Sequence, residues 1–569
     1  MDKNKAKHFL SKIEDLRLKE VRHALTEPFA DTLSAPSEFP ATLKAHGLYS
    51  TTQFVLRLSP KIHELVDAIT NGQTDGYDRN ELLLAYSTYL HETIHWWQHV
   101  GSTSGLILSL CYPAQCVSNM EHLRTVVRLI GPKKSLKIWA ENTLRASPLS
   151  EDEALNEANR AVNNMIDTEF YKVLTVEPMR APEVFEDPYF ECVGHSYGIA
   201  YANTLHALID TCGFSASSLP DPEEWNEPLD ALREARHEGF YYGSPIRRAR
   251  VGLLDIFEGQ ARFNQLQFLQ SAGGPSDCMH YRNAGYFNGN YISAFDEFRR
   301  LTEFAWPDRI DDPLIALFLL ICDLAINPTR GFPFSLNAPE DIIIDIDPGA
   351  RFTRLCEAAK QNPALASAIL SRSLEEYVEV AGALTAPCGY DHPMAALETF
   401  VDLIDNDDGA ATLMREWESF RYTPANQPIR VMVSHFLAFC RDKYEHPEFF
   451  CWPGAYTAGR AVSDKYQEIF LSNLSLFSDR SDNDGIFPRA ISGRDKDAIY
   501  ETLNTFFGSI LLYHLTRQWV FEDGPFDYDL HWLTGRHDNE ETIAWTKKAF
   551  EANFGAHPDH FDLTKSTAA

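Results

Sequence analysis

The clearest element that the sequence predicts is a long helix between Asp78 and Gly101. Asp78 and Glu81 stand three residues apart in a pattern typical of a helix N-terminus, and Gly101 is typical of a helix end. Between them, leucine, tyrosine, isoleucine, tryptophan and valine occupy nearly every side of the helix. A helix that is apolar all round is a buried one, so we expect this segment to run through the interior of the protein.

Helical patterns recur along the rest of the chain, whereas candidate strands are few and short. A second strong helix is expected from Arg247 to Ala272, because a Gly-Gly-Pro sequence follows it. Other helices are expected near residues 4–25, 60–70, 114–130, 151–174, 196–211, 313–326, 363–383, 424–443, 495–517 and 538–553. Apolar runs predict strands at Thr52–Leu58 and Asp341–Asp345. The predicted fold class is therefore mainly α with a small β component.

The length of the chain predicts more than one packed region. At 569 residues it exceeds what one hydrophobic core usually serves. Prolines and a candidate strand make Gly331–Pro348 the expected boundary. We predict an N-terminal helical segment at 1–50, a domain that carries the chemistry at 51–335, and a helical C-terminal domain at 336–569.

Composition and charge exclude several classes of function. The formal net charge is −30, from 81 acidic and 51 basic residues, and such a surface repels the phosphates of nucleic acids and anionic lipids. The N-terminus has no apolar stretch of the secretion-signal type. The longest apolar run, Leu314–Cys322, is far short of the roughly 20 residues that cross a bilayer. Ten scattered cysteines without a CxxC pair indicate reduced thiols, so we expect a cytoplasmic protein with no direct contact to nucleic acid or membrane.

The buried helix contains a candidate metal site, the sequence HETIH from His91 to His95. Histidines four residues apart lie on one face of a helix, where both imidazoles reach a single Zn²⁺. Glu92 is rotated by about 100° from His91 and stands beside the ion, in position to take a proton from a zinc-activated water. Unpaired buried polar groups cost about 1–3 kcal/mol each, and a metal satisfies all three side chains together. Hydrogen-bonded core histidines without a metal are the alternative.

A catalytic zinc site has a third protein ligand and an open position. His99 continues the histidine stripe, but it lies about 12 Å along the helix from His91 and does not easily share the ion. Glu258 is the favoured third ligand, because it is an acidic residue in an apolar helix and has glycine and alanine beside it for close helix approach. The alternatives for the third ligand are Glu191, His195 and Glu238.

The two helices together resemble the gluzincin branch of zinc metallopeptidases. The shared pattern is HExxH followed by a glutamate on a later helix, with Ala261 three residues beyond that glutamate. The resemblance implies a zincin-like core within 51–335 and Zn²⁺ held by His91, His95 and Glu258. It also implies Glu92 as the general base, and a protein or peptide as the substrate.

The chain departs from the gluzincin pattern in two places. About 160 residues separate His95 from Glu258, which is longer than the usual interval. Arg262 stands where a thermolysin-like enzyme has an aspartate behind the zinc ligands. Asp255, one turn before Glu258, is our candidate to replace that aspartate by accepting a proton from a ligand imidazole.

Two other functions compete with the metallopeptidase. Gly194–Gly198 spells GxSxG, the nucleophile turn of α/β-hydrolases, with Ser196 as nucleophile, but no buried apolar strand precedes it. A serine hydrolase is therefore the less favoured alternative. A metal-stabilised binding or scaffold protein without turnover is the other alternative, and Glu92 distinguishes it from an enzyme, since a purely structural site does not need that residue.

Overall fold

The computed structural model describes residues 46–50, 54–147, 152–329, 339–489, 491, 494–528 and 540–565. It is 70% helix and 4% strand, which confirms the predicted mainly α class with a small β component. The helix expected near 4–25 lies outside the described residues. None of the described helices combines the length and the apolar character needed to cross a bilayer.

The first part of the chain is helical and includes the helix that carries the HETIH segment. Its helices are α2 (Pro60–Thr70), α3 (Arg79–Val100), α4 (Thr103–Ile130), α5 (Leu136–Ala146), α6 (Glu153–Val176), α7 (Ala181–Phe185), α8 (Val193–Ala207), α9 (Asn226–Glu234), α10 (Leu253–Ser271), α11 (Cys278–Asn283), α12 (Asn290–Thr302) and α13 (Pro313–Ile326). Of these, α4, α6 and α8 pack against one another as one layer, and both α3 and α12 lie against α10.

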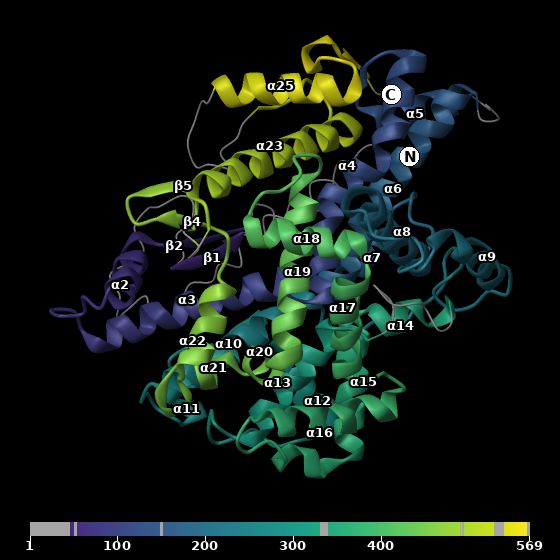
Figure 1. Ribbon diagram of the computed structural model, residues 1–569. Coiled ribbons are helices and arrows are strands. Elements are labelled where there is room, and N and C mark those ends of the chain that lie inside the picture. Colours follow the sequence, from purple (N-terminus) through teal and green to yellow (C-terminus); the bar gives the residue numbers. More distant parts are fainter. Residues whose placement is uncertain are drawn as a thin grey trace.

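The second part of the chain is also helical and packs onto the first. Its helices are α14 (Ile342–Ile346), α15 (Pro348–Gln361), α16 (Leu374–Thr385), α17 (Pro393–Asn406), α18 (Asp408–Ser419), α19 (Gln427–Glu445), α20 (Pro447–Cys451), α21 (Pro453–Tyr456), α22 (Asp464–Ser472), α23 (Lys496–Phe521) and α25 (Glu540–Phe554). Figure 1 shows α19 beside α3 and α4, and α23 and α25 at the opposite end from α12 and α16.

The predicted buried helix is α3, with the expected ends. The Asp78 carboxylate accepts hydrogen bonds from the N–H groups of Asn80 and Glu81, and the Gly101 N–H donates to the Trp97 carbonyl. These caps satisfy backbone groups that a helix end leaves without intrahelical partners. Most side chains of α3 are buried, so its polar residues are held in the interior.

A small sheet lies beside α3 and joins distant segments. Its strand order is β1 (Gly47–Ser50), β2 (Val55–Leu58), β4 (Phe477–Arg480) and β5 (Asn483–Pro488). β1 is antiparallel to β2, β2 is parallel to β4, and β4 is antiparallel to β5. A second pair, β3 (Lys133–Lys134) and β6 (Asp562–Leu563), is parallel. Within the strand predicted at Thr52–Leu58, residues Val55–Leu58 form β2, whereas residues 52–53 lie outside the described part of the chain. The purple and yellow-green strands meet in Figure 1.

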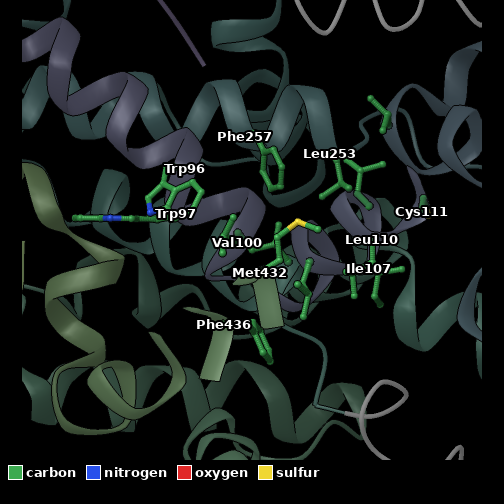
Figure 2. Packing of buried hydrophobic residues seen from close by; sticks show 14 of the residues in the cluster. Trp96, Trp97, Val100, Ile107, Leu110, Cys111, Leu253, Phe257, Met432 and Phe436 are labelled. Carbon is green, nitrogen blue, oxygen red and sulfur yellow. The ribbon is translucent and has the colours of Figure 1, made fainter. Parts of the chain in front are cut away.

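The hydrophobic core encloses the last turns of α3. Figure 2 shows Trp96, Trp97 and Val100 of α3 close to the apolar side chains of three neighbouring helices. These neighbours are Ile107, Leu110 and Cys111 of α4, Leu253 and Phe257 of α10, and Met432 and Phe436 of α19. All are at most 4% exposed. Because interiors are close-packed, this arrangement fixes the orientation of α3 and of the polar residues that it carries.

The strand predicted at Asp341–Asp345 is wrong, because that segment is helical. Residues 339–341 form a 3₁₀ turn and Ile342–Ile346 form α14. Ile342, Ile343 and Ile346 share one face of the helix and are buried, and α14 packs against α8. Packing of this apolar face outweighs the strand preference of β-branched isoleucine.

The helix predicted at Arg247–Ala272 is shorter than expected at its start. It is α10, which begins at Leu253, after Gly252. The shortening leaves Glu258 in the second turn of α10.

Candidate metal centre

Three side chains from two helices meet in the interior. His91 and His95 come from consecutive turns of α3, and Glu258 comes from α10, which packs along α3. One ligand atom of each lies within 4.8 Å of the others, and no other such group of histidine, cysteine and carboxylate side chains occurs among the described residues. His91 is 2% and Glu258 is 6% exposed. The predicted juxtaposition of Glu258 with the two histidines is therefore present.

The distances between the three ligand atoms match a tetrahedral metal site. His91 Nε2 and His95 Nε2 are 3.1 Å apart, and Glu258 Oε2 lies 3.4 Å from the first and 3.5 Å from the second. Ligands at about 2.0–2.1 Å from zinc at tetrahedral angles are about 3.3 Å from one another. The three atoms thus have the spacing of one face of a tetrahedron, and no fourth histidine, cysteine or carboxylate is grouped with them among the described residues.

Hydrogen bonding within the group leaves polar atoms unsatisfied. The two Nε2 atoms are within hydrogen-bond distance, and Glu258 Oε2, which is fully shielded from solvent, lies at the long limit of ion-pair distance from both of them. His91 Nδ1 is also buried and has no hydrogen-bond partner among the described residues. Leaving such an atom unpaired costs about 1–3 kcal/mol. A cation bound to both Nε2 atoms and to Oε2 would give the buried carboxylate a closer partner than the two imidazoles do, so the donor set fits a metal ion such as Zn²⁺.

Gln98 orients His95. Its Oε1 lies 2.8 Å from His95 Nδ1, and its Nε2 donates to the Phe257 carbonyl and to Gln260 Oε1, both at 2.9 Å. Because Gln98 Oε1 accepts, His95 Nδ1 carries a proton, so Nε2 is the ring nitrogen available to a metal ion. Gln98 also links α3 to α10 at the level of the site. Its position one turn after His95 is the only sequence signal for this role.

The three candidate ligands differ in their tendency to hold a proton. Burial, with the positive charges of His95 and Arg262, lowers the pKa of His91 to about 4. Burial also acts to lower the pKa of His95, but the carboxylates of Glu258 and Glu92 outweigh it and raise that pKa to about 9. Burial acts to raise the pKa of Glu258, but the positive charge of His95 outweighs it and holds the pKa well below its usual value. At neutral pH the metal-free group is therefore a neutral His91, a protonated His95 and an ionised Glu258.

Glu92 lies beside this group and against strand β1. It is 5% exposed, and its charge acts on His95. A Cβ atom added to Gly47 of β1 would lie 2.8 Å from both Glu92 Cγ and Oε1. Such contacts are shorter than side chains tolerate, so only glycine allows the strand backbone to pack directly on the Glu92 side chain. Nothing in the local sequence marks Gly47, because the contact joins segments that are distant along the chain.

Arg262 is buried near His91 and occupies the sequence position at which a thermolysin-like enzyme has an aspartate. Its side chain is fully buried, and its guanidinium carbon lies 3.6 Å from the centroid of the Tyr291 ring in α12. The Tyr291 ring meets the His91 ring edge-on, with centroids 5.8 Å apart. The buried cation therefore contributes to keeping His91 in the neutral form that binds metals.

His99 and Asp255 lie near the site, but neither belongs to the group of candidate metal ligands. The His99 ring stacks on Tyr49 and meets Phe257 edge-on, and burial lowers its pKa to about 3. Asp255 accepts a hydrogen bond from the Gly252 N–H at 3.3 Å and interacts with Ser293. The expectation that Asp255 accepts a proton from a ligand imidazole is wrong, because it caps the start of α10 and Gln98 meets the imidazole instead.

The other candidates for the third ligand lie in different surroundings. His195 Nε2 is 3.3 Å from Asp167 Oδ2 and 3.9 Å from Glu191 Oε2, so these side chains form a separate group. Glu238 is exposed and its Oε1 accepts the Arg247 N–H at 3.2 Å. None of the three belongs to the His91–His95–Glu258 group.

The GxSxG segment does not form a nucleophile turn. Gly194–Gly198 lies within the first turns of α8, which begins at Val193, and no strand leads into it. Ser196 is fully buried and donates to Asp167 Oδ1 at 2.8 Å. A hydroxyl that is enclosed and committed to a carboxylate is not placed to attack a substrate.

Comparisons of the chain with protein-family models, with curated proteins and with solved structures found no match.

Proposed function

We propose that this protein is a zinc-dependent hydrolase, most concretely a metallopeptidase with a zincin-like core that cleaves peptide bonds by attack of water. The observation that carries the proposal is the triangle of His91 Nε2, His95 Nε2 and Glu258 Oε2 with Glu92 beside it. Two histidines, one carboxylate and an open fourth corner are the donor set of catalytic zinc sites.

Each residue of the site has a distinct part in the proposed reaction. His91, His95 and Glu258 hold the ion, and Gln98 holds His95 with Nε2 toward it. When bound, zinc lowers the pKa of water from 15.7 to about 7 and polarises a carbonyl group. Glu92 takes the proton from the attacking water and delivers it to the leaving amine. The backbone of β1 at Gly47 holds the Glu92 carboxylate in place for both transfers.

A structural zinc in a binding or scaffold protein is the second candidate, and burial favours it. Glu92 is 5% and His91 is 2% exposed, so the site is enclosed on most sides. Turnover requires that water and substrate reach the fourth corner, whereas a structural site requires only the ligands. The two candidates predict different consequences for the loss of Glu92, since only hydrolysis uses it.

The decisive experiment compares Glu92→Gln with the wild type in hydrolysis of a mixed library of quenched fluorescent peptides. We expect Glu92→Gln to keep its zinc and its fold and to lose activity by about 10²–10⁴-fold, because an amide does not accept the proton. Glu234→Gln, on the exposed end of α9, is the matched control and should behave as wild type. Full activity in Glu92→Gln would rule out the general-base role. A wild type that contains zinc but cleaves no peptide would favour the structural candidate.

A further inference from the structure

His91 and His95 differ in what holds their rings. Gln98 Oε1 lies 2.8 Å from His95 Nδ1 and fixes which edge of that ring faces the metal centre. His91 Nδ1 is buried and has no hydrogen-bond partner among the described residues. Metal-binding histidines almost always have their second ring nitrogen hydrogen-bonded, and that bond orients the ring. The orientation of His91 is therefore set by a different kind of contact.

An aromatic ring from α12 supplies that contact. Tyr291 is 3% exposed, and its ring meets the His91 ring at an interplanar angle of 78°, with centroids 5.8 Å apart. Edge-to-face pairs of aromatic rings favour this geometry at centroid distances of about 4.5–7 Å. Within the described part of the chain, the other ring that meets His91 belongs to its fellow candidate ligand His95. Rotation of the His91 imidazole is thus resisted by Tyr291, because a turned ring loses the edge-to-face contact.

The Tyr291 ring is itself held by a buried cation. The Arg262 guanidinium carbon lies 3.6 Å from the centroid of the ring, and Arg262 is 0% exposed. Cation–π attraction strengthens when both groups are shielded from water, and a planar guanidinium covers a ring where a point charge does not. Arg262 therefore restricts the ring that packs against His91.

Hydrogen bonds tie this cation to the helix that carries His91. Arg262 Nη1 donates to Gln265 Oε1, and Gln265 Nε2 donates to the Ser87 hydroxyl at 3.1 Å. Ser87 lies one turn before His91 on α3, and both Ser87 and Gln265 are 0% exposed. Side chains of α10 thus link Tyr291 of α12 to α3 at the level of the metal centre.

We propose that Tyr291 and Arg262 form a brace that positions His91 for metal binding, in place of a hydrogen bond such as the one that Gln98 gives His95. The inference deepens the proposed function and rests on it, since it concerns how the same site binds its ion. Tyr291 and Arg262 act through His91, so they are positioning residues and not metal ligands. Loss of a group that orients a metal ligand costs about 10–100-fold in metal affinity, and we expect a loss of this order without the brace.

The test measures zinc affinity by competition with a chelator in variants of the full-length protein. Tyr291→Leu removes the ring and should lower zinc affinity about 10–100-fold. Tyr291→Phe keeps the ring and should stay within about threefold of the wild type. Arg262→Lys keeps the positive charge but loses the planar group that covers the ring, so zinc affinity should fall about tenfold. Because the charge is retained, its repulsion of zinc is unchanged, and the fall reports the loss of stacking.

A second buried pair of arginine and tyrosine provides the matched control. The Arg351 guanidinium carbon lies 4.1 Å from the centroid of the Tyr390 ring, and the two residues are 0% and 5% exposed. Tyr390→Leu should lower the urea concentration at the midpoint of unfolding, as Tyr291→Leu should, but it should leave zinc affinity unchanged. An equal loss of zinc affinity in Tyr390→Leu would show that general destabilisation lowers it, and would overturn the brace.

Three further outcomes would overturn the proposal. They are wild-type zinc affinity in Tyr291→Leu, wild-type affinity in Arg262→Lys, and a loss in Tyr291→Phe as large as that in Tyr291→Leu. Arg262→Lys decides the question if Tyr291→Leu does not fold.

Crystal structures of the metal-free wild type and of metal-free Arg262→Lys give a readout that does not depend on zinc. The His91 ring should turn from its wild-type orientation in the variant, and an unmoved ring would contradict the brace. A wild type that binds no zinc would end the proposed function, but the brace would still be decided by this comparison of ring orientations.

Discussion

At the scale of single residues, the site depends on how closely the backbone of β1 approaches Glu92. Gly47 is the point of contact, since a Cβ atom there would lie 2.8 Å from the carboxylate oxygen. A carboxylate that takes a proton from water works only within hydrogen-bond reach of that water, so a shift of the Glu92 side chain is more damaging to turnover than to metal binding.

Gly47→Ala tests this dependence. We expect kcat/KM for peptide hydrolysis to fall about 10–100-fold while the zinc content stays at the wild-type level, because a displacement of about 1 Å costs this much in rate. Gly198→Ala in α8 is the control, since its nearest contact would be an ordinary 3.6 Å to Leu229 Cδ1. Peptide assays and elemental analysis on the same preparations give the two quantities. Unchanged kinetics in Gly47→Ala would show that β1 does not position Glu92.

The proton on His95 gives a second prediction at this scale. With a pKa of about 9, His95 is protonated at pH 7, whereas His91, with a pKa of about 4, is neutral. Zinc binds only the neutral imidazole, so uptake at pH 7 releases about one proton from His95, besides about half a proton from a zinc-bound water whose pKa is about 7. Below the pKa of that water, between about pH 5 and 6.5, the apparent zinc affinity should therefore rise about tenfold per pH unit.

Zinc titration calorimetry of metal-free protein in buffers of different ionisation enthalpy measures this release. A buffer-independent heat at pH 7 would mean that no proton leaves, and it would contradict the charged state assigned to His95. A matched titration of His280→Ala, at an exposed histidine of α11, should reproduce the wild-type proton release.

At the scale of elements, the pairing of α3 with α10 builds the site. α3 supplies two ligands and α10 the third, and Gln98 connects the two helices through the Phe257 carbonyl and Gln260. Gln98 and the proposed zinc ion would therefore hold the same interface. Loss of either is expected to loosen the helix pair, because the remaining polar groups are buried.

Gln98→Met tests the role of this bridge. The side chain keeps its length but loses its amide, so we expect zinc affinity to fall about 10–100-fold, as for other groups that orient a metal ligand. The free energy of unfolding should also fall by about 1–3 kcal/mol, because buried partners lose their hydrogen bonds. Competition with a chelator and urea unfolding measure the two effects. Gln361→Met, at the exposed end of α15, is the control, and wild-type zinc affinity in Gln98→Met would refute the bridge.

Sequence patterns predicted the ends of α3 and the presence of α10, but they did not predict the contacts that the neighbouring segments make with the site. The caps at Asp78 and Gly101 set the ends of α3, and Glu258 stood out as a carboxylate in an apolar helix without a local partner. Gly47, Gln98 and Arg262 gave no comparable signal, since their roles arise from contacts with segments distant along the chain. The same limit explains α14, where packing against α8 makes a helix of an isoleucine run that favours a strand.

At the scale of the whole molecule, about 160 residues of sequence separate the two candidate histidine ligands from Glu258. The residues between His95 and Glu258 include α4, α6 and α8, which pack as one layer before the chain returns along α3 as α10. The sheet unites β2 with β4, and Asp479 of β4 accepts the Leu58 N–H and contacts His63 of α2 at 2.6 Å. Segments from both of the predicted regions 51–335 and 336–569 therefore pack together around α3, and the division between them stays a prediction.

The central claim, that His91, His95 and Glu258 bind one zinc ion, is tested most directly by the metal content of protein purified without a chelator. Elemental analysis should find about one zinc per wild-type chain, and it should find essentially none in His91→Ala, because two remaining ligands do not hold the ion. His280→Ala should contain as much zinc as the wild type. Wild-type protein without bound metal, or His91→Ala with an undiminished zinc content, would contradict the account.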